Sequence, residues 1–138
     1  VTQAFDAYEF HRFYQVVQNF CVVELSSLYF DVVKDILYCN APKDRTRLGV
    51  QTVLYEVLGV LGRLIVPVMP HLAEDVWSHW PEAQRPDFGL GRAPVSILLA
   101  DWPETRRDRM LEALQLDRFE ALLSLRETVN LALEEARS

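Results

Sequence analysis

The stretch YEFHRFYQVVQNFCVVELSSLYFDVVKDILY, residues 8–38, decides the fold. Along its first half the apolar side chains recur every three or four residues, which is the spacing that turns one face of a helix toward a core. The residues of this stripe are Phe10, Phe13, Val17 and Phe20, widened by Val16 and Cys21. The pattern predicts a helix over residues 4–23 that packs on more than one side.

A second helix is expected in the remainder of the stretch. Ser26 and Ser27 interrupt the apolar rhythm, and a serine hydroxyl can accept a hydrogen bond from a free backbone N–H at the start of a helix. The helix should then run to about residue 38. Its predicted buried residues are Leu28, Val32 and Ile36, and the opposite face should carry Asp31, Lys34, Asp35 and Tyr38.

Two more helices are predicted after a turn. Residues 39–44 contain a proline, which lacks a backbone donor and turns its predecessor away from helix, so a loop is expected there. Apolar periodicity predicts a long helix over 45–66, and a proline suits the first position of a fourth helix over 70–79. Gly59 and Gly62 cost helix stability relative to alanine, so we expect them to admit a neighbouring backbone.

Residues 81–138 have a different pattern, rich first in loop-forming residues and then in leucine. Prolines and glycines in residues 81–94 predict a surface loop. The sequence VSILL, residues 95–99, is typical of a short extended strand, which Pro103 must end. From about Thr105 to the last residue, recurring leucines predict a final helical segment with a joint near residues 116–117.

Together these elements predict an all-α fold, a helical bundle with one short extended strand near residues 95–99. A chain of 138 residues has the ordinary size of one domain. We therefore expect a single domain over residues 1–138. It would comprise a core bundle (1–80), a loop and strand segment (81–103) and a C-terminal helical segment (104–138).

Composition narrows the classes of function. Half of the residues are apolar, which suits a soluble globular protein and not a disordered one. The longest apolar run, Val57–Met69, is broken by Arg63 and Pro67 and falls short of the roughly 20 residues of a membrane-spanning helix, so no transmembrane segment is predicted. A formal charge of −6 weighs against nucleic acid as a partner, although a local basic patch can still bind phosphate.

The ends and the cysteines suggest part of an intracellular protein. The first residues lack the basic and apolar order of a signal peptide, and the last lack a helix-ending glycine or proline, so we expect two cuts inside a longer chain. Cys21 and Cys39 form no CxxC pair, which favours reduced thiols over a zinc site.

No catalytic set is predicted. His11, His71 and His79 all fall in helical segments, and although His71 beside Glu74 and Asp75 could act as a base or ligand, a hydrogen bond at a helix start explains it. The sequence also has no glycine-rich phosphate loop between a strand and a helix.

Several short sequence motifs along the chain resemble those of one protein family. Residues 8–38, with YEFH, FC and LSSLYFDVVKD in order, are similar to the helical pair that opens the anticodon-binding domain of isoleucyl-tRNA synthetases. QTVLYEVL at 51–58 and the P-x-x-P-H-x-A-E-D-x-W set at 67–77 resemble the next two helices. LLADWP at 98–103 resembles the following extended segment. The word PHLAE also fits valyl, leucyl and methionyl relatives, whereas residues 20–35 favour the isoleucyl ones.

This resemblance implies a fragment of an isoleucine–tRNA ligase that reads the anticodon stem-loop of tRNA(Ile) through stacking and hydrogen bonds to unpaired bases. It implies ATP and Mg²⁺ for the parent, at a catalytic domain with HIGH-type and KMSKS-type motifs that this chain lacks. Zinc is implied for a C-terminal tail. The other expected partners are the parent's catalytic and editing domains.

For this fragment we expect no cofactor, no metal, and neither a membrane nor DNA as partner. We place it in the cytoplasm or an organellar matrix. The alternative functions are a helical scaffold that packs only against other domains or proteins without RNA contact, or the equivalent domain of a valyl, leucyl or methionyl relative.

The expected RNA-binding residues are Lys34, Lys43, Arg45 and Arg47, a dense basic cluster around the loop after the second helix. The resemblance favours contacts with the phosphates or base edges of an anticodon loop. The alternative is that nearby aspartates pair with them as solvated surface charges of little energetic value. The family often has an R-R-S-x-Q word here, but Leu48 replaces the second arginine.

Aromatic side chains of the first helix offer a second mode of RNA contact, because rings can stack on unpaired bases. The candidates are Tyr8, Phe10, Phe13, Tyr14 and Phe20. Packing in the core is the alternative for each.

Overall fold

The computed structural model describes residues 1–105 and 110–137, and the chain divides into two compact units, residues 1–103 and 104–138. All regular structure in the described residues is helical, which confirms the predicted all-α class.

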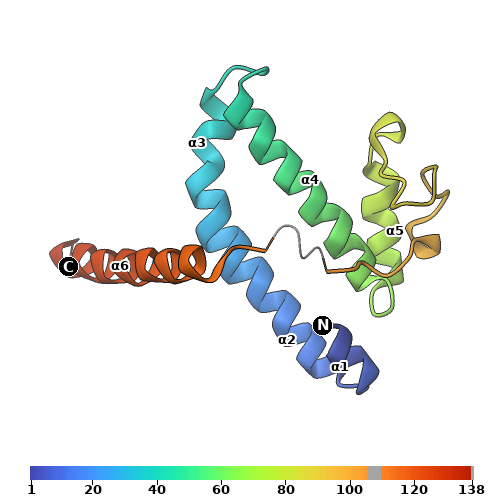
Figure 1. The fold of residues 1–138 in the computed structure, drawn as a ribbon, viewed down its shortest axis with the longest axis horizontal. Helices are drawn as coiled ribbons and strands as arrows, with labels where there is room; N and C mark the ends of the chain where they lie inside the picture. Colours follow the sequence, from blue (N-terminus) through green and yellow to red (C-terminus); the bar gives the residue numbers. More distant parts are fainter. Residues whose placement is uncertain (106–109, 138) are drawn as a thin grey trace. The chain divides into compact units, whose positions relative to one another are not determined.

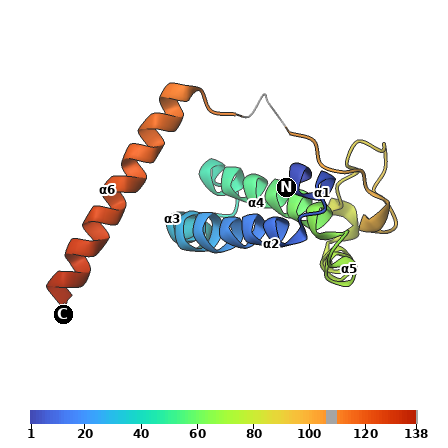
Figure 2. The same ribbon diagram turned by 90° about the horizontal axis from the view of Figure 1, so that it is seen from below.

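The first unit consists of helical elements, of which α2, η1 and α3 form one continuous helix. In chain order they are α1 (Thr2–Asp6), α2 (Phe10–Asn19), the π-helical η1 (Phe20–Phe30), α3 (Asp31–Cys39), α4 (Arg45–Ile65), α5 (Pro70–His79) and the 3-10 turns η2 (Glu82–Gln84) and η3 (Ile97–Leu99) (Figure 1). Helix α4 returns from the loop that follows α3, and α5 packs at the far end of α4 (Figures 1 and 2). The bounds of α4 and α5 agree with the predicted helices.

A sharp turn at residues 7–9 separates α1 from α2, where one continuous helix was predicted. The Glu9 N–H donates to the Ala4 carbonyl at 2.7 Å and the Tyr8 N–H donates to Phe5 at 3.0 Å. Tyr8 takes the left-handed φ of 55° that this helix-ending motif requires and that glycine usually supplies. The prediction failed because a tyrosine stands where the usual signal is glycine.

The predicted break at Ser26 and Ser27 is also wrong, because the helix continues from Phe10 to Cys39. Both hydroxyls point back along the helix: Ser26 Oγ donates to the Cys21 carbonyl at 2.8 Å, and Ser27 Oγ donates to the Val22 carbonyl at 2.9 Å. A serine that bonds its own helix in this way has no need to start a new one. The wider π turns of η1 absorb the change in apolar rhythm.

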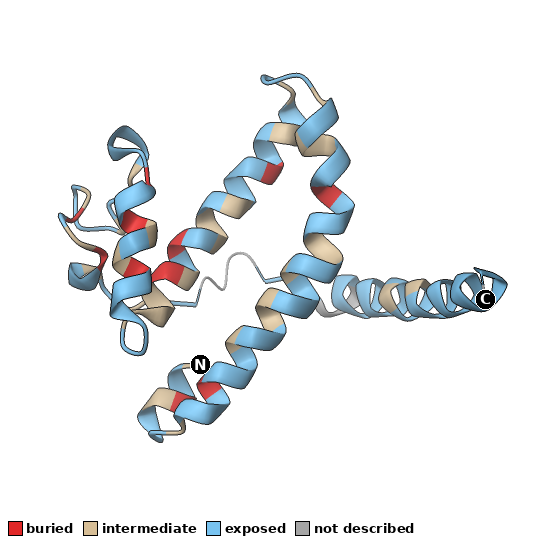
Figure 3. Ribbon diagram, turned by 180° about the vertical axis from the view of Figure 1, so that it is seen from behind, coloured by how far each residue is buried: buried red, intermediate tan, exposed pale blue. Residues whose placement is uncertain are grey.

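The main hydrophobic core lies where α4, α5 and η3 meet. Trp77 is only 1% exposed, and its ring packs against Trp80 and Phe88 with centroid separations of 5.9 and 5.7 Å. The guanidinium of Arg63 lies 4.3 Å from the Phe88 ring centroid. Figure 3 shows further buried residues between α1 and α2 and between α3 and α4, while most of the helical surface is exposed.

The predicted strand at residues 95–99 is wrong. Ser96 instead caps the 3-10 turn η3, accepting from the Leu98 N–H at 3.2 Å, and its hydroxyl donates to Glu74 Oε2 at 2.7 Å. Ile97 is 1% exposed because it enters the α4–α5 core. The apolar run reflects burial of one side chain, and no described segment pairs with it as a strand.

The close approach at the two glycines comes from side chains and not from a neighbouring backbone. A Cβ at Gly62 would lie 2.9 Å from Ile97 Cδ1, and one at Gly59 would lie 3.3 Å from Phe88 Cε1. These glycines therefore make room for the segment that follows α5.

The described regular structure of the second unit is α6 (Ala113–Arg137). It passes through residues 116–117 without the predicted joint, because nothing there prevents a helical conformation. Thr105 and residues 110–112 are not helical, and residues 106–109, which the predicted helix included, lie outside the described part of the chain.

Two helices, Phe10–Cys39 and Arg45–Ile65, are long and apolar enough to satisfy a length and hydropathy criterion for crossing a membrane. The length of the longest apolar run did not indicate these helices, because charged residues interrupt the apolar residues of each helix. The criterion is weak evidence, since core helices of soluble proteins also satisfy it.

Two alanine substitutions in α4 should have opposite effects on stability. Gly62→Ala should lower the free energy of unfolding by about 1–3 kcal/mol, because the new methyl group crowds the buried Ile97 side chain. Gly49→Ala should raise it by up to about 1 kcal/mol, because a Cβ at Gly49 meets nothing within 4 Å and alanine favours helix. Urea unfolding followed by tryptophan fluorescence measures both. Equal stability of the Gly62→Ala protein and the unsubstituted one would show that Ile97 moves freely.

Candidate nucleic-acid interface

The four basic residues expected to bind RNA all lie in residues 31–47, which we call the α3–α4 hairpin (Figure 1). The hairpin carries four cationic and three acidic side chains, whereas the whole chain has a formal charge of −6. It is therefore a locally positive region on an acidic chain. Val33 within the hairpin and Val50 just after it on α4 are buried, 4% and 8% exposed.

Asp44 organises the loop of the hairpin. Its Oδ1 accepts hydrogen bonds from the Arg47 N–H and from Asn40 Nδ2, each at 2.9 Å, so it caps α4 and holds the end of α3. The hydrogen bond from Asn40 and then that from Arg47 lower the pKa of Asp44 below its ordinary value. The fold thus engages one oxygen of this carboxylate.

Arg47 braces the same loop from the other side. Its Nη1 donates to the Asn40 carbonyl at 2.8 Å, and the side chain is half-buried. Its Nε is buried and finds no partner among the described residues. Arg47 therefore differs from a freely solvated cation, a distinction that sequence spacing could not reveal.

Lys34 pairs with an acidic neighbour on α3. Its Nζ lies 2.7 Å from Asp31 Oδ1, and the two side chains are 55% and 51% exposed. The hydrogen bond to Asp31 raises the pKa of Lys34. Because an exposed pair of this kind contributes little to stability, a phosphate could compete for the lysine.

Lys43 and Arg45 are the two exposed cations at the turn itself. Lys43 lies in the loop and Arg45 is the first residue of α4. Neither makes a side-chain hydrogen bond or an ion pair with any residue that the structure describes. Both are thus available to an anion. Leu48, at the position of the missing arginine, is 47% exposed.

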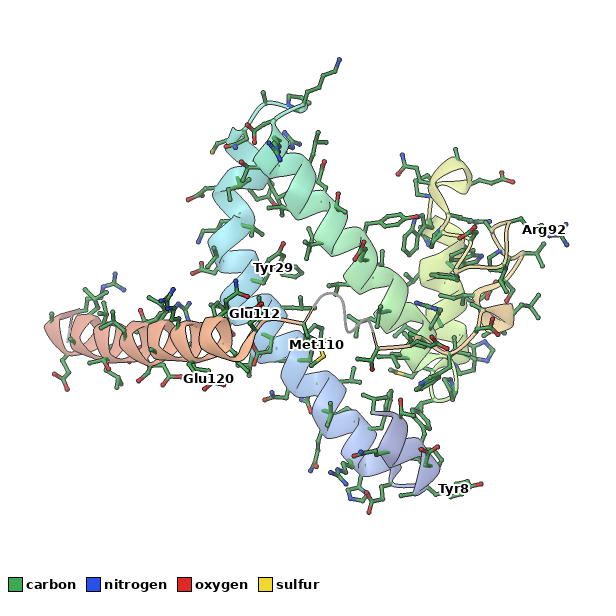
Figure 4. All side chains as sticks on the ribbon, in the orientation of Figure 1. Tyr8, Tyr29, Arg92, Met110, Glu112 and Glu120 are labelled. Carbon is green, nitrogen blue, oxygen red and sulfur yellow. The ribbon has the colours of Figure 1, made fainter. Side chains whose placement is uncertain are left out.

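The aromatic candidates of the first helix divide by exposure. Phe13 is 2% exposed and its ring centroid lies 4.8 Å from that of Phe5, so it belongs to the core. Phe10 is half-exposed and packs edge-on against Phe5, and Phe20 is partly buried. Tyr8 and Tyr14 are exposed, and Tyr8 lies at the end of the long helix away from the hairpin (Figure 4).

A cavity of about 390 Å³ lies elsewhere, between α4 and α5. Its lining residues are Tyr55, Leu58, Asp75, Val76, His79, Trp80 and Pro81. The Tyr55 hydroxyl donates to the Gln84 carbonyl at 2.7 Å, and His79 Nδ1 lies 2.8 Å from the Asp75 carbonyl oxygen. Local backbone contacts thus engage these polar groups. Across the described ranges, no three His, Cys, Asp or Glu side chains gather as a metal site.

The whole chain is similar to proteins of a known family. The whole chain, residues 1–138, matches the family described as the anticodon-binding domain of tRNA ligase. Among similar proteins, the isoleucine–tRNA ligase of Gloeobacter violaceus is 47% identical over 138 residues, that of Syntrophomonas wolfei 39% over 138, and that of Desulforudis audaxviator 42% over 137. These matches cover 99–100% of this chain but only 13–14% of the relatives' length.

Removing the Asp44 carboxylate should loosen the start of α4. In an Asp44→Ala protein the backbone amide of Arg47 should exchange with deuterium faster, because it loses its capping acceptor. Asp35→Ala, which removes an exposed carboxylate of α3, is the control and should leave that exchange unchanged.

Acid should imitate this substitution in the unsubstituted protein. Folding lowers the pKa of Asp44, so the ionised carboxylate stabilises the folded protein. This contribution to stability is complete above the ordinary pKa of 3.8 and is lost as the pH falls through the lower pKa of the folded state. Protection of the Arg47 amide, corrected for the intrinsic exchange rate, should decrease below pH 3.8. Unchanged protection in both experiments would show that the cap is dispensable.

Proposed function

The chain belongs to the family of anticodon-binding domains of tRNA ligases, and from this premise we propose that it recognises the anticodon stem-loop of tRNA(Ile) within an isoleucine–tRNA ligase. The names of its relatives support the isoleucine enzyme over the valyl, leucyl and methionyl ones. The chain spans 13–14% of their length, so the proposal concerns one part of a larger protein.

The observation that carries the proposal is the pair of exposed cations at the turn of the α3–α4 hairpin. Lys43 and Arg45 have no internal partner in the described chain, while Asp44 between them is engaged by Asn40 and by the Arg47 N–H. A phosphate that approaches the turn therefore meets two available positive charges.

The four basic residues have different roles in this proposal. Lys43 and Arg45 contact the RNA backbone directly. Lys34 exchanges its solvated pair with Asp31 for a phosphate. Arg47 acts by holding the loop through the Asn40 carbonyl, so it positions the two exposed cations.

The chemistry of aminoacylation would lie in other parts of the parent. A catalytic domain would bind ATP and Mg²⁺ and join isoleucine to the tRNA, an editing domain would remove errors, and a C-terminal tail could hold zinc. We further propose that residues 1–138 act as one anticodon-binding domain, in the cytoplasm or an organellar matrix.

A helical scaffold without RNA contact is the second candidate. The extensive exposed apolar surface of the helix Phe10–Cys39 favours it, because such a surface suits packing against other domains. A scaffold, however, requires no positively charged turn and gives Lys43 and Arg45 no role.

A fluorescence titration with the full-length ligase separates the two candidates. Labelled tRNA(Ile) should bind more tightly than the same tRNA with a changed anticodon. Equal affinity for both would exclude anticodon recognition and would leave the scaffold.

Neutralising the two exposed cations should weaken binding and its dependence on salt. For Lys43→Ala combined with Arg45→Ala, the slope of log affinity against log salt should fall in magnitude by about 1.4, because two phosphate contacts to a single-stranded loop are lost. Arg92→Ala is the matched control, since Arg92 is an exposed arginine far from the hairpin in the same unit (Figure 4). The control should leave the slope unchanged. Equal slopes for the control and the double variant would place the phosphate contacts elsewhere.

A further inference from the structure

We propose that Tyr38 is a stacking platform for an unpaired nucleobase of the RNA bound at the α3–α4 hairpin. The inference rests on the proposed RNA-binding function and adds a contact with a base to the contacts with phosphates.

The first argument is the exposure of the ring. Tyr38 is 87% exposed, more than any other large apolar or aromatic side chain in the described residues. It stands in the last turn of α3, and no hydrogen bond, aromatic contact or ion pair joins it to the described chain. Tyrosine is a weaker helix former than alanine, leucine or lysine, so helix propensity gives no reason for it here. The fold makes almost no use of this ring.

The second argument is the register of α3. Lys34 precedes Tyr38 by four residues, so the two share one face of the helix, which differs from the face of the buried Val33. The loop with Lys43 and the start of α4 with Arg45 follow within seven residues. The exposed ring is therefore placed between cations on both sides along the chain.

This arrangement fits the chemistry of a single-stranded nucleotide. Each nucleotide presents a flat aromatic base next to a phosphate, and single-strand binding sites combine stacking rings with positive charge. Bases in an RNA loop are free to leave the helix stack and lie on such a ring. A purely electrostatic surface would need only the cations.

The two most exposed of the other tyrosines lack this arrangement. Tyr8 lies away from the hairpin and takes a left-handed backbone conformation (Figure 4). Its ring packs edge-on against Phe10, with the ring centroids 6.4 Å apart. Tyr14 is 60% exposed on α2, which makes no direct contact with α4. Tyr14 is therefore a matched control of the same residue type on the same long helix.

The test uses the full-length ligase and a fluorescently labelled RNA hairpin with the anticodon stem-loop sequence of tRNA(Ile). Tyr38→Ala should weaken binding roughly 5- to 150-fold, the loss expected for one stacked base. Tyr38→Phe should bind as the unsubstituted protein does, because it keeps the ring, and so should Tyr14→Ala. The salt slope of Tyr38→Ala should stay unchanged, because stacking releases no counterions.

Two further measurements identify the base and exclude misfolding. With 2-aminopurine at successive loop positions, one position should show quenched fluorescence with the unsubstituted protein and with Tyr38→Phe, but not with Tyr38→Ala. Thermal unfolding of Tyr38→Ala should match that of the unsubstituted ligase, because the ring is almost fully exposed.

The failure of this inference can be distinguished from failure of the proposed function. If Tyr38→Ala binds normally while Lys43→Ala with Arg45→Ala binds weakly, the stacking role is wrong and RNA recognition stands. If Tyr38→Ala instead slows isoleucine activation without changing RNA affinity, the ring contacts another domain and the inference is overturned. If neither variant changes affinity and the anticodon sequence has no effect, the proposed function itself is wrong.

Discussion

The hydrogen bonds to the Asp44 carboxylate are the interaction on which the arrangement of the hairpin depends. One oxygen accepts from Asn40 at the end of α3 and from the first turn of α4, so a single side chain joins the end of one helix to the start of the next. Within the described chain, α3 is the only segment of the long helix that contacts α4. The way in which α4 follows α3 therefore depends on this turn and on the contacts between the two helices.

The same turn separates two kinds of cation. Arg47 is drawn inward by the Asn40 carbonyl, whereas Lys43 and Arg45 have no internal partner. A carboxylate that is already hydrogen-bonded to the fold competes less for neighbouring cations than a free one does. At physiological salt, screening over about 8 Å also limits what distant acidic residues contribute at the hairpin. A chain with a formal charge of −6 can thus present a positive turn to a phosphate.

The sequence predicted correctly those helices that are specified by residues close together in the chain. The periodicity of α4 and the proline at the start of α5 specified both helices, because helical spacing and a missing N–H act within a few residues. The errors occurred where a local signal had two physical solutions. Ser26 and Ser27 could cap a helix or bond back into one, and the apolar run at residues 95–99 could pair as a strand or bury Ile97. Only the surrounding chain decides between such solutions.

The sequence by itself determined the all-α class, the family resemblance and the position of the basic cluster, because these depend on residue type and spacing along one chain. Tertiary structure decided how the members of that cluster differ. Arg45 and Arg47 are two residues apart and chemically identical, yet one is exposed and the other is braced against Asn40. It also showed that Tyr38 remains almost fully exposed while Phe13 is buried. Burial and hydrogen bonding depend on what the folded chain brings close, which spacing along the sequence does not specify.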